Sequence, residues 1–175
     1  MSDLAQTAVL EAAAALRLPV TAVIPQRPPF LLIDRIVDAQ PGQFAVSRYS
    51  VRHDNPVFAG HFPDFPVLPG VLLVENMAQT ACWALASKVQ AQPTAEPSLY
   101  VLARINQCTF QRLVCPGDEL TTRAQLTRRL GHFALFDCEV RVGEACAAKS
   151  ELLVARRAAP AMAAKPAADS TPFYS

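Results

Sequence analysis

Apolar and polar residues alternate with a period of two through the last third of the chain. Between residues 119 and 130 every odd position is polar, and the even positions carry Leu120, Ala124, Leu126 and Leu130. Residues 132–142 alternate again, with Phe136, Cys138, Val140 and Val142 on one face. Gly131 and the Gly143-Glu144 pair mark tight turns before a third run over residues 145–154. Half-buried strands joined by short turns predict an antiparallel meander.

The first two thirds predict three more strands and one long helix. Short apolar runs cover residues 30–38, 43–51 and 99–110, and Gln40-Pro41-Gly42 is a turn signal between the first two. The Pro69-Gly70 pair opens a helical pattern over residues 71–88, since proline suits the start of a helix. We therefore predict an α+β fold in which an antiparallel sheet of about six strands wraps around one long central helix.

The ends of the chain differ from this core. Residues 1–19 are alanine-rich and predict a helical N-terminal extension, which Pro19 limits. Residues 158–175 are rich in alanine and proline and have little to bury, so we expect a disordered tail. The core domain is accordingly predicted over residues 20–157.

Composition narrows the class of protein. The 175 residues are 51% hydrophobic and 18% charged, with a net charge of +1, so the chain can bury a sizeable core. Such a balanced charge argues against a nucleic-acid partner. The low charge also predicts that apolar surface is covered by another subunit.

Cysteine spacing and the N-terminal sequence predict a cytoplasmic protein. The five cysteines form no CxxC pair, which fits reduced thiols better than a zinc site or a disulfide framework. Asp3 and Glu11 lie where a signal peptide would be basic. The longest apolar stretch, residues 71–89, is interrupted by Glu75, Asn76, Gln79 and Thr80, which argues against a membrane span.

His61 and Glu75 are the candidate catalytic residues. His61 lies in a loop of aromatic and proline residues, and Glu75 interrupts an apolar helix. A carboxyl in apolar surroundings has a raised pKa and can act as a general acid, while a neutral imidazole can act as a base. The backbone N–H groups near Gly70 and Val71 at the helix start can hold a developing oxyanion. Together these groups suit proton abstraction beside a carbonyl with loss of a β-hydroxyl as water.

The residues alone leave a structural interpretation open. Asn76, Gln79 and Thr80 lie near Glu75 at helical spacing, so the four residues can equally form a structural polar stripe. A single histidine in a loop is commonly a hydrogen-bonding surface residue.

Four segments resemble the β-hydroxyacyl-acyl carrier protein dehydratases of type II fatty acid synthesis, and the FabZ branch in particular. They are IPQRPPFLLIDRI at residues 24–36, GHFPDFPVLPGVLLVE at 60–75, NMAQ at 76–79 and CPGD at 115–118. The resemblance covers residues 20–154. It implies a hot-dog fold, assembly as a homodimer or trimer of dimers, and a site shared between subunits.

In this resemblance His61 is the base and Glu75 of the other subunit is the acid, while the Gly70 amide polarises the thioester carbonyl. The substrate arrives on the phosphopantetheine of an acyl carrier protein, without a further cofactor or metal, and its acyl chain enters a tunnel for which Phe62, Gln79 and Tyr100 are candidates. Glutamate in place of aspartate at position 75 argues against double-bond isomerisation. A possible basic docking patch for the carrier protein comprises Arg123, Arg128, Arg129, Arg156 and Arg157, although a solvated strand face fits these arginines equally well.

Three residues depart from the family pattern. Gln26 replaces a common histidine, Asp64 replaces a glycine, and Gln107 stands where a basic residue is frequent. Asp64 either raises the pKa of His61 or faces solvent. These departures, with the extended termini, suggest a paralogue from a specialised polyketide or polyene pathway, including one that pairs with another dehydratase. The alternative functions are an acyl thioesterase, an enoyl-coenzyme A hydratase and a non-catalytic partner subunit.

Overall fold

A computed structural model describes residues 10, 12–90 and 98–158. Its elements are α2 (Val20–Val23), β1 (Arg35–Gln40), β2 (Phe44–Ser50), η1 (Pro56–Ala59), α3 (Gly70–Gln90), β3 (Ser98–Phe110), β4 (Glu119–Leu130), β5 (Phe133–Val142) and β6 (Ala145–Ala158). Residues 12–16 are also helical, within the predicted N-terminal extension. The predicted tail lies outside the described residues except for Ala158, which ends β6. The division into extension, core and tail stays a prediction.

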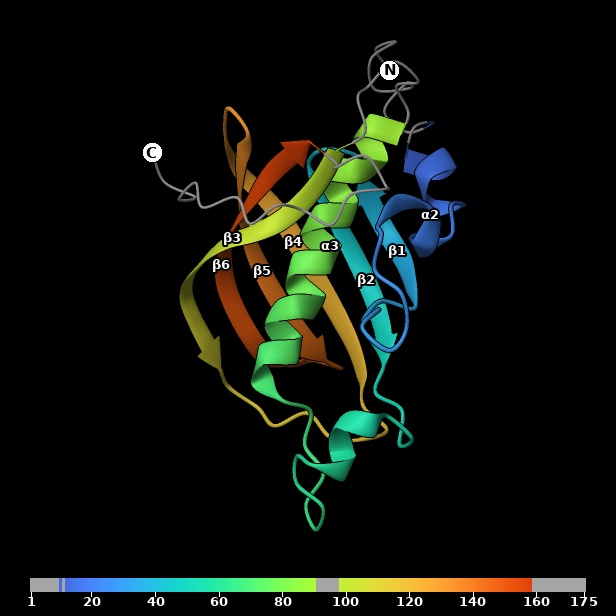
Figure 1. Cartoon of the computed structure of the whole chain (residues 1–175), viewed down its shortest axis with the longest axis vertical. Helices are drawn as coiled ribbons and strands as arrows, with labels where there is room; N and C mark the ends of the chain where they lie inside the picture. Colours follow the sequence, from blue (N-terminus) through green and yellow to red (C-terminus); the bar gives the residue numbers. More distant parts are fainter. Residues whose placement is uncertain (1–9, 11, 91–97, 159–175) are drawn as a thin grey trace.

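The six strands form one antiparallel sheet in the order β1-β2-β4-β5-β6-β3, and α3 runs along one face of it (Figure 1). The predicted meander is confirmed as β4-β5-β6. The chain then differs from a simple meander, because β3 pairs with β6 at the far edge although it precedes β4 in sequence. The sheet curves around the helix, which confirms the predicted α+β architecture.

The core lies between α3 and the concave face of the sheet. Met77, Ala81, Trp83 and Ala84 of α3 are completely buried, and so are Leu120, Phe136, Val140 and Leu152 of the sheet. The period-two pattern points most of its apolar positions at the helix, as predicted. Leu130 is the exception: it is 58% exposed and follows a register shift between Leu126 and Arg128. A helix that is apolar on most sides is a buried helix, which explains why the long apolar stretch belongs inside the sheet.

The first strand is shorter than its pattern predicted. Residues 30–34 precede β1 rather than forming part of it. Their backbone groups bond instead to polar side chains of α3: Leu32 N donates to Gln79 Oε1, and Leu32 O accepts from Asn76 Nδ2. Leu32 and Ile33 of this segment are buried although they lie outside the strand.

Candidate active site

The site is built around the start of α3, at the lower end of the molecule in Figure 1, where the loop that contains η1 leads into the helix. The first backbone N–H groups of a helix have no partner inside it, and the helix dipole makes this end positive. A Cβ on Gly70 would lie 2.9 Å from the ring of Phe110, so close packing favours glycine here. The side chain of Val71 is 72% exposed.

His61 is held in one orientation by its own loop. Its Nδ1 lies 2.9 Å from the carbonyl oxygen of Val67, and its ring stacks on that of Phe62 with centroids 4.1 Å apart. A carbonyl oxygen only accepts hydrogen bonds, so Nδ1 carries the proton and the neutral ring leaves Nε2 as the basic nitrogen. This is the tautomer that a general base requires.

Glu75 lies in a cavity of about 220 Å³ between α3 and β3. Burial raises the pKa of Glu75 above its ordinary value, and a hydrogen bond from Gln79 Nε2 to Glu75 Oε1 (2.8 Å) partly opposes that rise. Two of the three tunnel candidates, Gln79 and Tyr100, line the same cavity as Glu75. A carboxyl that favours its protonated form can serve as an acid.

Asn76, Thr80 and Gln79 do form a structural stripe, as the alternative interpretation proposed. Thr122 Oγ1 donates to Asn76 Oδ1, while the hydroxyls of Thr80 and Ser47 lie 2.8 Å apart. Gln79 bonds Leu32 N and Phe30 O in addition to Glu75. The side chains of Asn76, Gln79 and Thr80 therefore attach α3 to the neighbouring strands and to the segment before β1. Glu75 differs from them because its carboxyl lines a cavity.

Several predicted site residues do not line this cavity within one chain. The predicted site residues outside its lining are His61, Phe62, Gly70 and Val71. The cavity is also lined by six residues that the sequence did not single out as site residues: Gln26, Ala78, Cys82, Leu99, Val101 and Leu102. Of these, only Gln26 carried a sequence signal, namely its departure from the family's histidine. Asp64, the second departure, is exposed.

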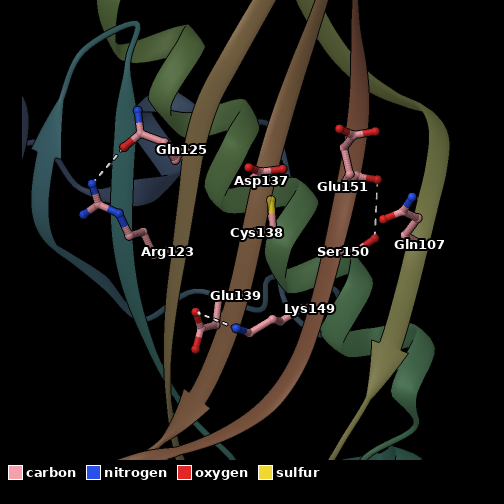
Figure 2. Close-up of a pocket in the computed structure, with 9 residues that line it drawn as sticks. All are labelled: Gln107, Arg123, Gln125, Asp137, Cys138, Glu139, Lys149, Ser150 and Glu151. Atoms are coloured by element: carbon pink, nitrogen blue, oxygen red, sulfur yellow. Dashed lines mark hydrogen bonds and ion pairs between the residues drawn. The ribbon is translucent and has the colours of Figure 1, made fainter.

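A larger hollow of about 450 Å³ lies on the other face of the sheet, away from α3 (Figure 2). Gln107, the third departure, lines it beside a β-bulge and has a positive φ of 46°. Its polar groups pair with one another, as in the Lys149–Glu139 ion pair (3.6 Å) and the hydrogen bond from Arg123 to Gln125 (2.8 Å). Such an open polar wall does not suit an acyl chain, so the Glu75 cavity is the better candidate site.

Residues 24–151 match the model of the FabA-like domain family. The chain belongs to this family. It is 38% identical over 135 residues to the 3-hydroxyacyl-acyl-carrier-protein dehydratase FabZ of Psychrobacter arcticus, a match that covers 77% of this chain and 91% of the relative. The corresponding FabZ of Shewanella woodyi is 40% identical, with 77% of this chain and 87% of the relative covered. The family predicted from the four sequence segments is confirmed.

Solved structures support the hot-dog fold of the family. The dehydratase heterocomplex ApeI:P from Xenorhabdus doucetiae matches with a TM-score of 0.66 at 19% identity, covering 80% of this chain and 91% of that one. The virulence protein Cj0977 from Campylobacter jejuni matches with a TM-score of 0.60 at 13% identity, covering 85% and 91%. At these identities the likeness concerns the fold alone.

No helix among the described residues is long and apolar enough to cross a membrane. Across residues 10, 12–90 and 98–158, no three histidine, cysteine or acidic side chains gather in a way that would hold a metal ion.

Proposed function

We propose that this protein is a hydro-lyase that dehydrates 3-hydroxyacyl thioesters carried on an acyl carrier protein, giving trans-2-enoyl thioesters for fatty acid or polyketide synthesis. The observation that carries the proposal is Glu75, a half-buried carboxyl with a raised pKa in a cavity between α3 and β3. Membership of the FabA-like family, with relatives named as FabZ dehydratases, supports the same activity.

The proposed mechanism gives each group one task. His61 Nε2 removes the α proton of the thioester, since its Nδ1 proton is committed to Val67 O. The N–H groups of Gly70 and Val71 stabilise the charge that develops on the thioester oxygen. Glu75 then donates its proton to the departing 3-hydroxyl, which leaves as water. No further cofactor is needed, because the thioester itself makes the α proton acidic.

A second copy of the chain is proposed to complete the site. His61 lies outside the Glu75 cavity of its own chain, so a partner's histidine supplies the base in this account. Large apolar side chains are exposed around the start of α3 and need a cover: Phe62, Phe65, Val71, Phe110 and Leu113. In the described sheet β3 is an edge strand of 13 residues, which can pair with a second β3. A homodimer, or a trimer of dimers built from it, meets these requirements.

The carrier protein is proposed to dock beside Tyr100. Lys88, Arg129, His132 and Arg156 line a hollow of about 210 Å³ together with Tyr100, which also lines the Glu75 cavity. Burial raises the pKa of Tyr100, whereas Arg156 and Arg129 lower it, so the phenol stays uncharged near neutral pH. A cationic hollow next to the acid suits the phosphate of phosphopantetheine and an acidic carrier surface. Of the predicted basic patch, Arg129 and Arg156 meet here, while Arg123 lies over the Phe44 ring near the outer hollow.

We propose a cytoplasmic location. It is supported by the five cysteines, all of which are free thiols in the structure.

Burial raises the pKa of the Cys82 thiol to about 12, so this thiol beside Glu75 is not a nucleophile.

The test is to incubate the pure protein with 3-hydroxybutyryl-acyl carrier protein and to follow the intact carrier by mass. Loss of one water with the thioester retained is the expected result. Release of the free carrier thiol would indicate a thioesterase, and an unchanged mass would indicate a non-catalytic subunit. Repeating the assay with 3-hydroxybutyryl-coenzyme A separates the carrier-dependent dehydratase from a coenzyme A hydratase, which would prefer the latter substrate.

A further inference from the structure

One buried polar atom beside Glu75 has no partner. Gln26 lines the same cavity as Glu75, and its Oε1 is buried without a hydrogen bond to any described residue. A buried acceptor left unpaired costs free energy, and such atoms are rare in folded proteins. A bound ligand with a hydrogen-bond donor would give Gln26 Oε1 the partner that it lacks.

The backbone around Gln26 is fixed, so the free acceptor is not a loose side chain at a frayed end. The guanidinium of the neighbouring Arg27 donates to three backbone oxygens, those of Thr21, Ile24 and Gln26 itself. Ile24 is buried in the core. These bonds hold the backbone that carries Gln26 at the lining of the Glu75 cavity.

Glu75 does not satisfy this acceptor. Glu75 Oε1 accepts a hydrogen bond from Gln79 Nε2. Gln79 also donates to Phe30 O and accepts from Leu32 N, so its amide is fully used. The residues that line the cavity thus include the carboxyl of Glu75 and Gln26, whose Oε1 is an unpaired acceptor. A hydroxyl group matches this pair, because it has a lone pair to take a proton and a hydrogen to donate.

We propose that Gln26 binds the 3-hydroxyl of the substrate, its Oε1 accepting the hydroxyl hydrogen while Glu75 faces a lone pair of the same oxygen. This assignment rests on the proposed dehydratase function. It makes Gln26 a binding residue for the leaving group, a role that the sequence did not assign to it.

The balance of the step is simple. The C–O bond breaks and its electrons stay with oxygen, which takes the proton of Glu75 and departs as water. The electrons of the α C–H bond form the new double bond, and the α proton goes to the base. The water leaves with two hydrogens, one facing the Glu75 carboxylate and the other still bonded to Gln26 Oε1. Gln26 therefore contacts substrate and product water in one geometry.

The test replaces Gln26 with methionine, which is similar in length but has no amide. We expect kcat/KM for 3-hydroxybutyryl-acyl carrier protein to fall about tenfold, the worth of one lost hydrogen bond. Competitive inhibition by the butyryl thioester, which has no hydroxyl, should stay within about twofold of the unsubstituted protein. Gln43→Met, the same change at an exposed turn, is the matched control and should alter neither value.

Two further readouts separate substrate binding from a structural role. The thermal midpoint of Gln26→Met should equal or exceed that of the unsubstituted protein, because the change removes an unpaired buried acceptor. Gln26→His, which keeps an acceptor, should recover part of the lost activity.

Three results for Gln26→Met would each overturn the proposal. They are an unchanged kcat/KM, a lowered thermal midpoint, or a loss of affinity for the butyryl inhibitor as large as the loss of kcat/KM for the substrate. Failure of the unsubstituted protein to dehydrate the substrate would contradict the proposed function itself.

Discussion

At the scale of single residues, the immediate neighbours of His61 and Glu75 set where each of these side chains holds its proton. A backbone carbonyl fixes the proton of His61 on Nδ1, and burial favours the protonated form of Glu75. For His61 the cause is a hydrogen bond within its loop, and for Glu75 it is burial. The acid and base roles that we propose rest on these surroundings rather than on the residue types alone.

The raised pKa of Glu75 predicts a pH dependence of stability. Because the folded protein holds this proton more tightly than the unfolded chain, stability falls as pH rises from the ordinary glutamate pKa through the folded pKa. Chemical unfolding of the wild type and of Glu75→Gln across this range measures it. With rising pH, the unfolding free energy of the wild type should fall relative to that of Glu75→Gln. The difference should become constant above the folded pKa of Glu75. A difference that does not vary with pH would show that burial does not perturb this carboxyl.

At the scale of elements, α3 combines a buried apolar helix with a polar seam that ties it to the chain before β1. Gln79 is completely buried and joins Phe30 O, Leu32 N and Glu75. The same seam therefore holds the fold together and orients the acid. Polar residues on α3 that argue against a membrane span serve as the helix's attachment points.

Replacing Gln79 with leucine should cost about 2–4 kcal/mol of unfolding free energy, since Leu32 N and Phe30 O lose their partner. Urea unfolding monitored by the fluorescence of Trp83, which is fully buried, measures the change. Gln43→Leu at an exposed turn serves as the control and should stay within about 0.5 kcal/mol of the wild type. A loss as small as that of the control would mean that the seam is dispensable.

The contact between the start of α3 and the end of β3 carries a second prediction. In Gly70→Ala the new methyl group meets the Phe110 ring and displaces either the ring or the helix start. We expect kcat/KM to fall at least about tenfold, because the oxyanion donors move. Truncating the ring in Gly70→Ala/Phe110→Ala should recover activity relative to Gly70→Ala in the same assay. No recovery would place the role of Gly70 elsewhere than in this contact.

Local patterns predicted the elements well, and long-range contacts explain what they missed. The helix was expected over residues 71–88 and is Gly70–Gln90, and the alternating pattern of β4 matches Glu119–Leu130 in both bounds. The segment at residues 30–34 resembles a strand because it continues a short apolar run, yet Asn76 and Gln79 bind its backbone. The edge position of β3 depends on pairing with β6, which no local pattern encodes. Gln26 enters the cavity by the same kind of long-range packing.

At the scale of the whole molecule, the proposed base and acid are separated within one chain, because His61 does not line the cavity of Glu75. The low charge of the sequence predicted a covered face, and exposed aromatic residues do gather beside His61, among them Phe62 and Phe65. Glu75 lies in a separate cavity against β3. Two copies related by a two-fold axis would bring each histidine to the other chain's acid.

Mixing two inactive variants tests this central claim most directly. His61→Ala and Glu75→Gln should each dehydrate 3-hydroxybutyryl-acyl carrier protein at least about 100-fold more slowly than the wild type. After the two are unfolded together and refolded, half of the dimers are mixed, and each has one site with both residues intact. The account predicts recovery of roughly a quarter of the wild-type activity. Activity that stays at the level of the separate variants would contradict a site shared between two chains.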